Sequence, residues 1–363
     1  MRRRLNFSAT LEPAELAKIA RLRYVTDADA GYTRRRNGKG FLYLDGRGKP
    51  LRDPRKLKRI ESLVIPPAWK EVWICGASNG HLQATGRDAR QRKQYLYHAR
   101  WQQIANLAKF LRMEQFGELL PKIRRKIARQ ISTNELTRER VLAGMVALLD
   151  LTGIRVGNEE YVKENGSYGL ATLRDRHVAV TSAGVELRFR AKGGFRRNVL
   201  IDDKQLARFI VACAELRGPR LFQCVDGEDI RRPIESADVN EYLQQAAGEA
   251  ITAKDFRTWK ASALAAGQLH AARDRKSKSA RKRLVRETVC QAAELLSNTP
   301  TVCRNYYIHP GLLESYEAGV FDSHFEGFSP RRLKLLAADE QVLARFLNQW
   351  KPAVDAPIAT GAA

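Results

Sequence analysis

Two adjacent tyrosines, Tyr306 and Tyr307, lie near the end of the segment NTPTVCRNYYIH in a strongly basic chain. A phenol with a pKa of about 10 is a poor nucleophile at neutral pH. Nearby cations lower that pKa and stabilise the charge that builds up on a phosphate under attack. The segment therefore predicts attack on a phosphodiester if the chain also supplies cations and a proton donor. Without them, the two tyrosines are better explained as half-buried aromatic residues.

Three cations elsewhere in the sequence have suitable surroundings. Arg155 lies in TGIRVGNEEY between Gly153 and Gly157, which allow a tight backbone around a planar guanidinium that can bind phosphate oxygens. Lys254 and Arg257 are three residues apart, so they share one helix face and can together bind a phosphate. Taken singly, Arg155 could be in a surface ion pair, and the other two could form a solvated face.

Lys192 is the candidate proton donor. It begins the Lys-Gly-Gly sequence at which a β-hairpin must turn. A lysine is flexible, and its pKa falls readily near other cations, which suits a general acid. An exposed turn lysine is the alternative explanation.

The tyrosine segment predicts a helix with Thr299 as its cap and Pro300 at its first position. Tyr306 and Tyr307 then fall in its second and third turns, before His309 and Pro310 interrupt it. Adjacent helix residues point about 100° apart, so the two tyrosines cannot both enter one site.

The composition favours a polyanionic partner. The 363 residues carry 64 lysines and arginines against 40 acidic residues, a formal charge of +24. An excess of this size favours nucleic acid, and RNA or ribosome binding is the alternative. Apolar residues make up 44% of the chain, which indicates a globular protein with room for two domains.

Several classes of protein are not supported by the sequence. The sequence contains no apolar run of 18 residues, so we expect no membrane span. Its start is basic but lacks the apolar stretch of a secretory signal, so we expect none. The five cysteines are scattered without a Cys-x-x-Cys pair, so we expect neither disulfides nor a metal site. A protein without disulfides fits a reducing compartment, and we therefore expect it in the cytoplasm. The phosphate-binding pattern GxxxxGK[ST] is absent, which leaves a nucleotide cofactor unsupported.

The residue patterns predict an α+β fold. After a short helical segment within residues 5–24, short β-like runs alternate with glycine turns from Tyr32 to about Tyr97, so residues 1–98 should form a β-rich domain that binds nucleic acid. Residues 99–351 should form a mainly helical catalytic domain with a three-stranded β insertion near residues 177–201, in which Val185, Leu187 and Phe189 face the core. Thr133 and Asp202 are the expected caps of two helices, and residues 352–363 are expected to be a disordered tail.

Taken together and in this order, five motifs resemble those of the poxvirus-like bacterial type IB DNA topoisomerases. The motifs are QATGRDARQRKQYLYHARW, TGIRVGN, AKGG, KDFRTWKAS and NTPTVCRNYYIHP. The resemblance extends over nearly the whole chain apart from the tail. Each motif is weak alone, whereas five in the family order form a specific pattern.

The resemblance implies a set of residue roles. The family pattern places the nucleophile nine positions after a histidine or asparagine, which selects Tyr307 over Tyr306 and pairs it with Asn298. Arg155, Arg257 and Lys192 then match the two arginines and the lysine that assist the tyrosine. Lys254 matches an additional phosphate contact, and DNA contacts are also expected from Arg87, Arg90, Arg92, Tyr97 and Tyr161.

The resemblance further implies relaxation of supercoiled duplex DNA through a transient 3′-phosphotyrosyl bond, without metal or nucleotide. It also implies a C-shaped clamp that acts as a monomer in the cytoplasm, associated with the nucleoid. A tyrosine recombinase shares this chemistry, but its second arginine usually lies in a His-x-x-Arg motif, and here Lys254 holds the histidine position. A non-enzymatic DNA-binding protein explains the charge but not the ordered set of site residues.

Overall fold

The computed structural model of the chain describes residues 12–38, 40–225, 231–273 and 277–350, and the expected disordered tail 352–363 lies outside these ranges. The chain divides into two compact units, the first extending to Arg112 and the second starting at Met113. The division falls within helix α3 (Ala99–Ile131), which begins in the first unit and continues into the second.

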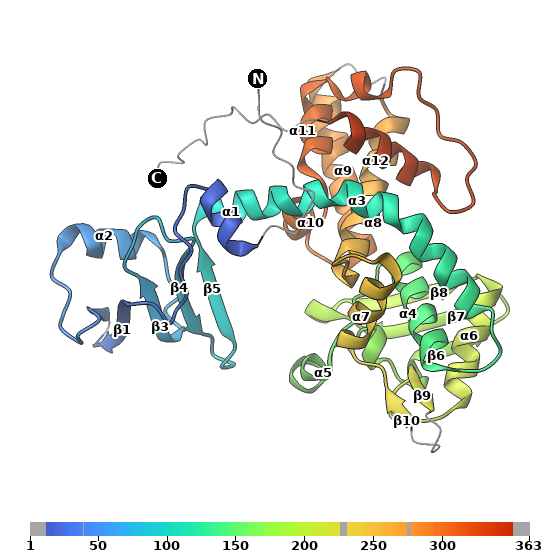
Figure 1. Cartoon of the computed structure of the whole chain (residues 1–363), viewed down its shortest axis with the longest axis horizontal. Helices are drawn as coiled ribbons and strands as arrows, with labels where there is room; N and C mark the ends of the chain where they lie inside the picture. Colours follow the sequence, from blue (N-terminus) through green and yellow to red (C-terminus); the bar gives the residue numbers. More distant parts are fainter. Residues whose placement is uncertain (1–11, 39, 226–230, 274–276, 351–363) are drawn as a thin grey trace. The chain divides into compact units, whose positions relative to one another are not determined.

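The first unit is built on a five-stranded antiparallel sheet in the order β2-β1-β3-β4-β5 (Figure 1). Its elements are α1 (Pro13–Ile19), β1 (Gly31–Asn37), β2 (Gly40–Leu44), α2 (Pro54–Ser62), β3 (Lys70–Cys75), β4 (Leu82–Arg87) and β5 (Lys93–Tyr97). The β-rich character expected for this part of the chain is confirmed.

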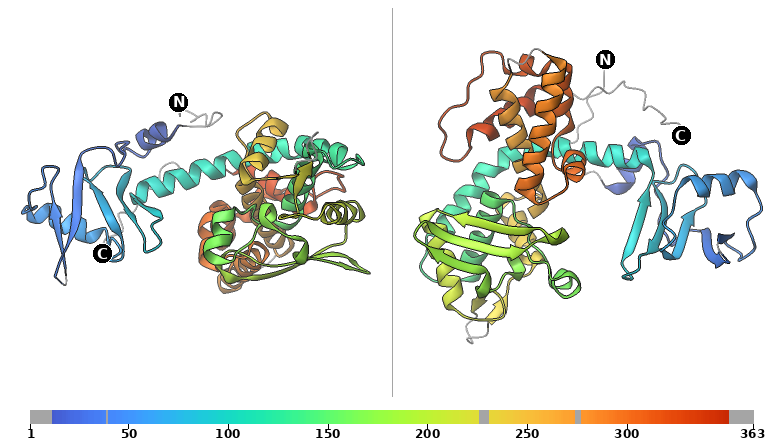
Figure 2. Two further views of the ribbon diagram at one scale, coloured as in Figure 1. Left: turned by 90° about the horizontal axis from the view of Figure 1, so that it is seen from below. Right: turned by 180° about the vertical axis from the view of Figure 1, so that it is seen from behind.

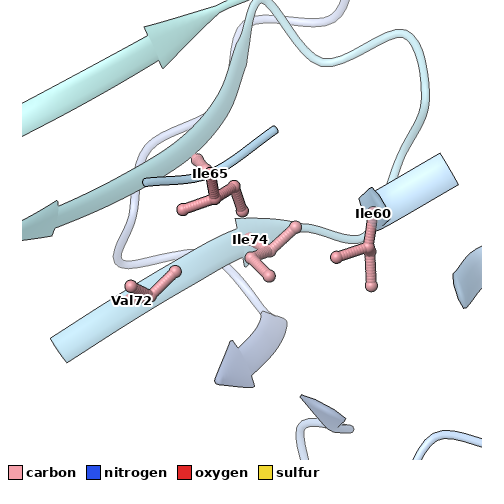
Figure 3. Packing of buried hydrophobic residues seen from close by; sticks show 5 residues of the cluster. Ile60, Ile65, Val72 and Ile74 are labelled. Carbon is pink, nitrogen blue, oxygen red and sulfur yellow. The ribbon is translucent and has the colours of Figure 1, made fainter. Parts of the chain in front are cut away.

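A small apolar cluster between α2 and the sheet forms the core of this unit. Val72 and Ile74 alternate along β3 and point to the same face, where they meet Ile60 of α2 (Figure 3). Ile65 and Ala84 complete the cluster, and all five side chains are buried. Burial of this one face holds the helix on the sheet.

The second unit is mainly helical (Figure 2). Its helices are α4 (Arg138–Thr152), α5 (Glu159–Asn165), α6 (Lys204–Glu215), α7 (Ser236–Ala247), α8 (Ala253–Ala271), α9 (Lys278–Leu296), α10 (Pro300–Tyr306), α11 (Pro310–Ala318) and α12 (Ala338–Gln349), with 3-10 turns η1 (Leu170–Thr172), η2 (Asp175–His177), η3 (Lys192–Gly194) and η4 (Phe321–Phe325). Its strands are β6 (Val178–Thr181), β7 (Gly184–Arg190), β8 (Arg196–Ile201), β9 (Gln223–Val225) and β10 (Arg231–Pro233). Together with the first unit, this confirms the α+β fold.

The three-stranded insertion has the order β6-β7-β8 and is antiparallel. Val185, Leu187 and Phe189 are buried, as their alternation predicted, while Arg188 and Arg190 are exposed. The turn between β7 and β8 is η3, which contains the expected Lys-Gly-Gly sequence. The chain pattern therefore located this hairpin correctly.

Helix α8 lies at the centre of the second unit, where it packs against α4, α7, α9, α11 and α12. Its Trp259 is buried, and the indole Nε1 donates to Glu340 of α12 at 2.9 Å. Glu340 also pairs with Arg124 of α3 at 2.7 Å, and Arg124 in turn pairs with Asp150 of α4 at 2.7 Å. Although burial favours its neutral acid, Arg124 lowers the pKa of Glu340, so this chain of charged groups ties three helices to α8.

Two expected helix caps were wrong by a few residues. Thr137, not Thr133, caps α4, and its hydroxyl accepts from the Arg140 amide at 3.3 Å. Thr133 lies just beyond α3, and its hydroxyl instead donates to the carbonyl of Gln130 in the last turn of that helix. Likewise α6 is capped by Asp203 and not Asp202. In both places a second capping side chain stands nearby, and the packing of the helix decides which one is used.

We expect Thr137→Ala to lower the free energy of unfolding by about 1 kcal/mol, because it removes the cap of α4. Thr133→Ala, a matched change outside the cap, should cost less than about 0.5 kcal/mol. Urea denaturation of both variants, followed by circular dichroism, measures the difference. Equal losses in the two variants would contradict the assigned cap.

Candidate active site

Arg155 lies on a short segment that follows α4, and two glycines fix the backbone on either side of it. Gly153 ends the helix with a φ of 64°, a left-handed conformation that favours glycine. Gly157 lies so close to Gly169 that a Cβ on Gly157 would be 2.8 Å from the Gly169 Cα. The Arg155 carbonyl accepts from the Leu170 amide at 2.9 Å. The motif glycines therefore hold Arg155 in place.

Arg257 of α8 is only 4% exposed and joins the ends of two other helices. Its Nη1 donates to the Gly153 carbonyl at the end of α4, and its Nη2 donates to the Leu296 carbonyl at the end of α9 at 2.9 Å. Its Nε has no protein partner within the described residues. Burial, followed by the charge of Arg155, lowers the pKa of Arg257 to about 10.

Arg197 of β8 is a third arginine at this site, and the sequence motifs did not identify it. Its guanidinium donates to the Leu295 carbonyl at 2.8 Å, to the Ser297 hydroxyl at 3.1 Å and to the Thr152 carbonyl at 3.2 Å. It stands opposite Phe189 on the inward face of the sheet. The two-residue alternation of β8 was the signal that could have revealed an inward-facing arginine.

Asn298 follows the end of α9 and contacts Arg155 directly. The Arg155 guanidinium donates to the Asn298 Oδ1 and, at 3.3 Å, to the Ser297 carbonyl. With its oxygen held in this way, Asn298 directs its Nδ2 elsewhere. That nitrogen is buried and has no partner among the residues the structure describes. It is a donor that a bound phosphate oxygen can use.

Tyr307 is held from its backbone and from its ring. Its carbonyl accepts from the Ser262 hydroxyl of α8 at 3.1 Å, and that hydroxyl accepts from the His309 amide at 3.0 Å. The Arg257 guanidinium lies 5.2 Å from the ring centroid. Both Arg155 and Arg257 hydrogen-bond to the Tyr307 side chain. The phenol therefore lies between the two motif arginines.

The pKa of Tyr307 reflects this position. Burial alone would raise it, since burial disfavours the phenolate. The charge and hydrogen bond of Arg257, followed by the charges of Arg155 and Lys254, outweigh burial and lower the pKa. The site thus supplies what a phenol nucleophile lacks by itself.

The two tyrosines differ in their environments. Thr299 caps α10 and Pro300 begins it, as predicted, but the helix ends at Tyr306. Tyr307 is therefore the residue after the helix, with φ −128° and ψ −24°, and not part of a third turn. Tyr306 is 45% exposed, whereas Tyr307 contacts Ser262 and Arg257 of α8.

Lys192 and Tyr161 contact each other at the edge of the site. The Lys192 Nζ donates to the Tyr161 hydroxyl at 3.3 Å and lies 4.6 Å from the centroid of its ring. Lys192 also lines a small cavity together with Arg155, Arg197 and Arg257. The hairpin lysine and the motif arginines, far apart in sequence, thus border one space.

Lys254 borders a second, larger cavity, which Arg155 and Arg257 also line. The cavity has a volume of about 300 Å³, and its lining includes Lys254, Arg155, Arg257 and Tyr307. Lys254 is exposed and Arg257 is buried, although both lie on the same face of α8. One cation is therefore fixed by protein contacts, and the other faces solvent.

The remaining candidate DNA contacts belong to the first unit. Arg87 of β4 pairs with Glu71 at 2.9 Å, and Arg92 pairs with Asp88 at 2.7 Å. Arg90 is exposed in the turn between β4 and β5. Tyr97 of β5 is half-buried and stacks on Tyr95, with ring centroids 6.0 Å apart; burial raises the Tyr97 pKa.

The described residues offer neither a metal-binding cluster nor a membrane-spanning helix. Within residues 12–350, apart from the three short gaps, no group of three histidine, cysteine or acidic side chains is arranged to hold a metal ion. None of the helices that the structure describes is long and apolar enough to cross a membrane.

Comparisons with known proteins agree with the geometry. Residues 98–322 match the family model of the eukaryotic DNA topoisomerase I catalytic core, and residues 40–88 match that of the bacterial DNA topoisomerase IB N-terminal domain. The DNA topoisomerase 1B of Acanthamoeba polyphaga mimivirus is 31% identical over 295 residues, which cover 79% of this chain and 88% of the viral protein. The DNA topoisomerase 1B of Vaccinia virus (strain Copenhagen) is 23% identical over 259 residues, covering 69% and 76% respectively.

The first family model spans more than half of the chain, and its match includes Arg155, Arg197, Arg257 and Tyr307. On this basis, the chain belongs to the type IB DNA topoisomerases.

Proposed function

We propose that Tyr307 is the nucleophile with which this type IB DNA topoisomerase cleaves one strand of duplex DNA. The phenolate oxygen attacks a backbone phosphorus, the bond to the 5′-oxygen breaks, and a 3′-phosphotyrosyl bond forms. The observation that carries this assignment is the position of the Tyr307 phenol between Arg155 and Arg257, which lower its pKa. Tyr306, by contrast, is 45% exposed.

The two arginines and Asn298 bind the non-bridging oxygens of the phosphate. Negative charge accumulates on these oxygens in the transition state, and fixed donors stabilise it without reorganisation. Arg155 and Arg257 are fixed by contacts with helix ends and with Asn298, while the Asn298 Nδ2 is the donor left open.

Lys192 donates a proton to the departing 5′-oxygen, so that a hydroxyl and not an alkoxide leaves. Its contact with the Tyr161 hydroxyl holds the flexible side chain beside the cavity that the arginines line. Lys254, exposed beside Tyr307, contacts an adjacent phosphate, and Arg87, Arg90, Arg92, Tyr97 and Tyr161 contribute further DNA contacts, mostly through phosphates.

The cycle ends when the 5′-hydroxyl attacks the phosphotyrosyl bond and restores the strand. Rotation of the free end between the two steps relaxes supercoils. Because each bond broken is replaced by one of similar energy, the chemistry consumes no nucleotide. The cationic side chains of the site stabilise the charge on the phosphate, a role that a metal has in other enzymes, so we propose that no metal is needed. All the site residues come from one chain, so we propose that the enzyme acts as a monomer on nucleoid DNA.

The wild-type protein should relax a supercoiled plasmid in the presence of EDTA and without nucleotide. Tyr307→Phe should form no covalent adduct with a labelled duplex, because it lacks the attacking oxygen. Tyr306→Phe is the matched control and should retain the adduct. An inactive wild type, or an adduct that depends on Tyr306 and not on Tyr307, would refute the assignment.

Asn298→Ala should slow single-turnover cleavage by about 10²-fold, the usual effect of losing one donor to a transition-state oxyanion. Asn298→His, which restores a donor, should recover much of this loss. Cleavage rates at saturating duplex, with melting temperatures to check folding, measure both effects. An unchanged rate in Asn298→Ala would remove Asn298 from the site.

Lys254→Ala should raise the pKa of Tyr307 toward its ordinary value of 10.0, because the Lys254 charge helps to lower it. At a fixed pH below that pKa, less phenolate is then present. Carbon-13 NMR of Cζ-labelled tyrosine in the DNA-free protein measures the pKa, with Tyr307→Phe to assign the resonance. Lys163→Ala, an exposed lysine of α5, is the control; an equal shift there, or none in Lys254→Ala, would contradict the structure.

A further inference from the structure

Two arginines face each other across the β7–β8 hairpin, directly beside the turn that carries Lys192. Arg190 and Arg196 are cross-strand partners, and both are exposed. The Arg190 Nη2 is 3.4 Å from where a Cβ of Gly194 would be, so its guanidinium lies over the turn. In the part of the chain that the structure describes, no acidic side chain pairs with either arginine.

Like charges directly opposite each other weaken a strand pair. The same face shows how this chain can avoid that effect. Two pairs further along the hairpin, and on the same face, Arg188 lies opposite Asn198, and its Nε donates to Glu186 of the same strand at 2.7 Å. The hairpin therefore neutralises Arg188 and leaves the charges of the last pair exposed.

The two faces of the hairpin present different groups. Phe189 and Arg197 point inward and line the small cavity that also includes Lys192 and Arg155. Because side chains alternate along a strand, Arg190 and Arg196 point to the opposite face. In the right-hand view of Figure 2 the three strands lie in front of the helices of the second unit. Among the elements of the second unit that the structure describes, none lies over this face in that view.

We propose that Arg190 and Arg196 form a second phosphate-binding site, whose ligand is the backbone of the DNA strand complementary to the one cleaved. The inference rests on the proposed function, which places the cleaved strand on the Lys192 side of the hairpin. A ligand that meets both faces must offer phosphates on two sides of the hairpin tip. The two backbones of a duplex do so, and a single strand does not.

Binding at this second site would position the hairpin on the DNA. When phosphates of the complementary strand bind the arginine pair, the repulsion between the two guanidinium groups is relieved and the hairpin tip is held against the duplex. Lys192 is two residues beyond the end of β7, so the same contact holds the lysine near the cleaved strand. The arginine pair thus makes the enzyme bind a duplex substrate more tightly than a single strand.

The test measures how salt weakens DNA binding by a Tyr307→Phe protein, which cannot cleave. Each phosphate contact adds about 0.9 to the slope of log affinity against log salt. Arg190→Gln and Arg196→Gln should each make that slope shallower by about 1 on a duplex and leave it unchanged on the isolated cleaved strand. Arg188→Gln removes the same charge from the same face and should change neither slope, because Glu186 already neutralises Arg188.

The substituted proteins should fold, since both side chains are exposed and their removal relieves repulsion; a melting temperature at or above that of the parent checks this. Wild-type plasmid relaxation, measured in parallel, separates the two hypotheses. An inactive wild type refutes the proposed function. If the wild type is active, three results would overturn this inference alone. They are an unchanged duplex slope in Arg190→Gln and Arg196→Gln, an equal change on duplex and single strand, or the same change in Arg188→Gln.

Discussion

The site depends on the buried guanidinium of Arg257, which joins the carboxyl ends of two helices to a third. From α8 it donates to the last carbonyls of α4, at Gly153, and of α9, at Leu296. The residues that follow those two ends are Arg155 and Asn298, which contact each other. One side chain therefore determines where Arg155 and Asn298 meet, and it also lies against the Tyr307 ring. Substituting it would remove both hydrogen bonds that link α8 to these helix ends, and a cation at the same time.

Helix ends also explain how several arginines can lie so close together. The carboxyl end of a helix carries partial negative charge on carbonyls that lack an intrahelical partner. Arg197 and Arg257 both use such carbonyls at the ends of α4 and α9, so neither needs an acidic side chain. An aspartate or glutamate in this place would neutralise the field that lowers the Tyr307 pKa. Satisfying arginines with backbone carbonyls keeps their positive charge effective toward a phenolate and a phosphate.

Much of the fold follows from local patterns that the sequence displays. The alternation of Val185, Leu187 and Phe189 located an amphipathic strand, and the Lys-Gly-Gly sequence located its turn, because both signals depend on neighbouring residues only. The predicted start of α10 at Thr299 and Pro300 is also correct for this reason. The caps of α4 and α6 were misplaced, because Thr133 and Thr137, or Asp202 and Asp203, are locally equivalent. Packing of the helices against α8 and the sheet chooses between them.

The sequence by itself determined the identity of the motif residues, their order and the charge that favours a DNA substrate. It did not determine which groups surround Tyr307, since Arg155 is 152 residues away and Lys192 is 115 residues away along the chain. Only the tertiary structure brought Arg197 into the site, placed the Tyr307 phenol between two arginines and directed Tyr306 outward. The physical reason is that electrostatic fields and hydrogen bonds depend on distances in space, which are set by helix packing and not by separation in sequence.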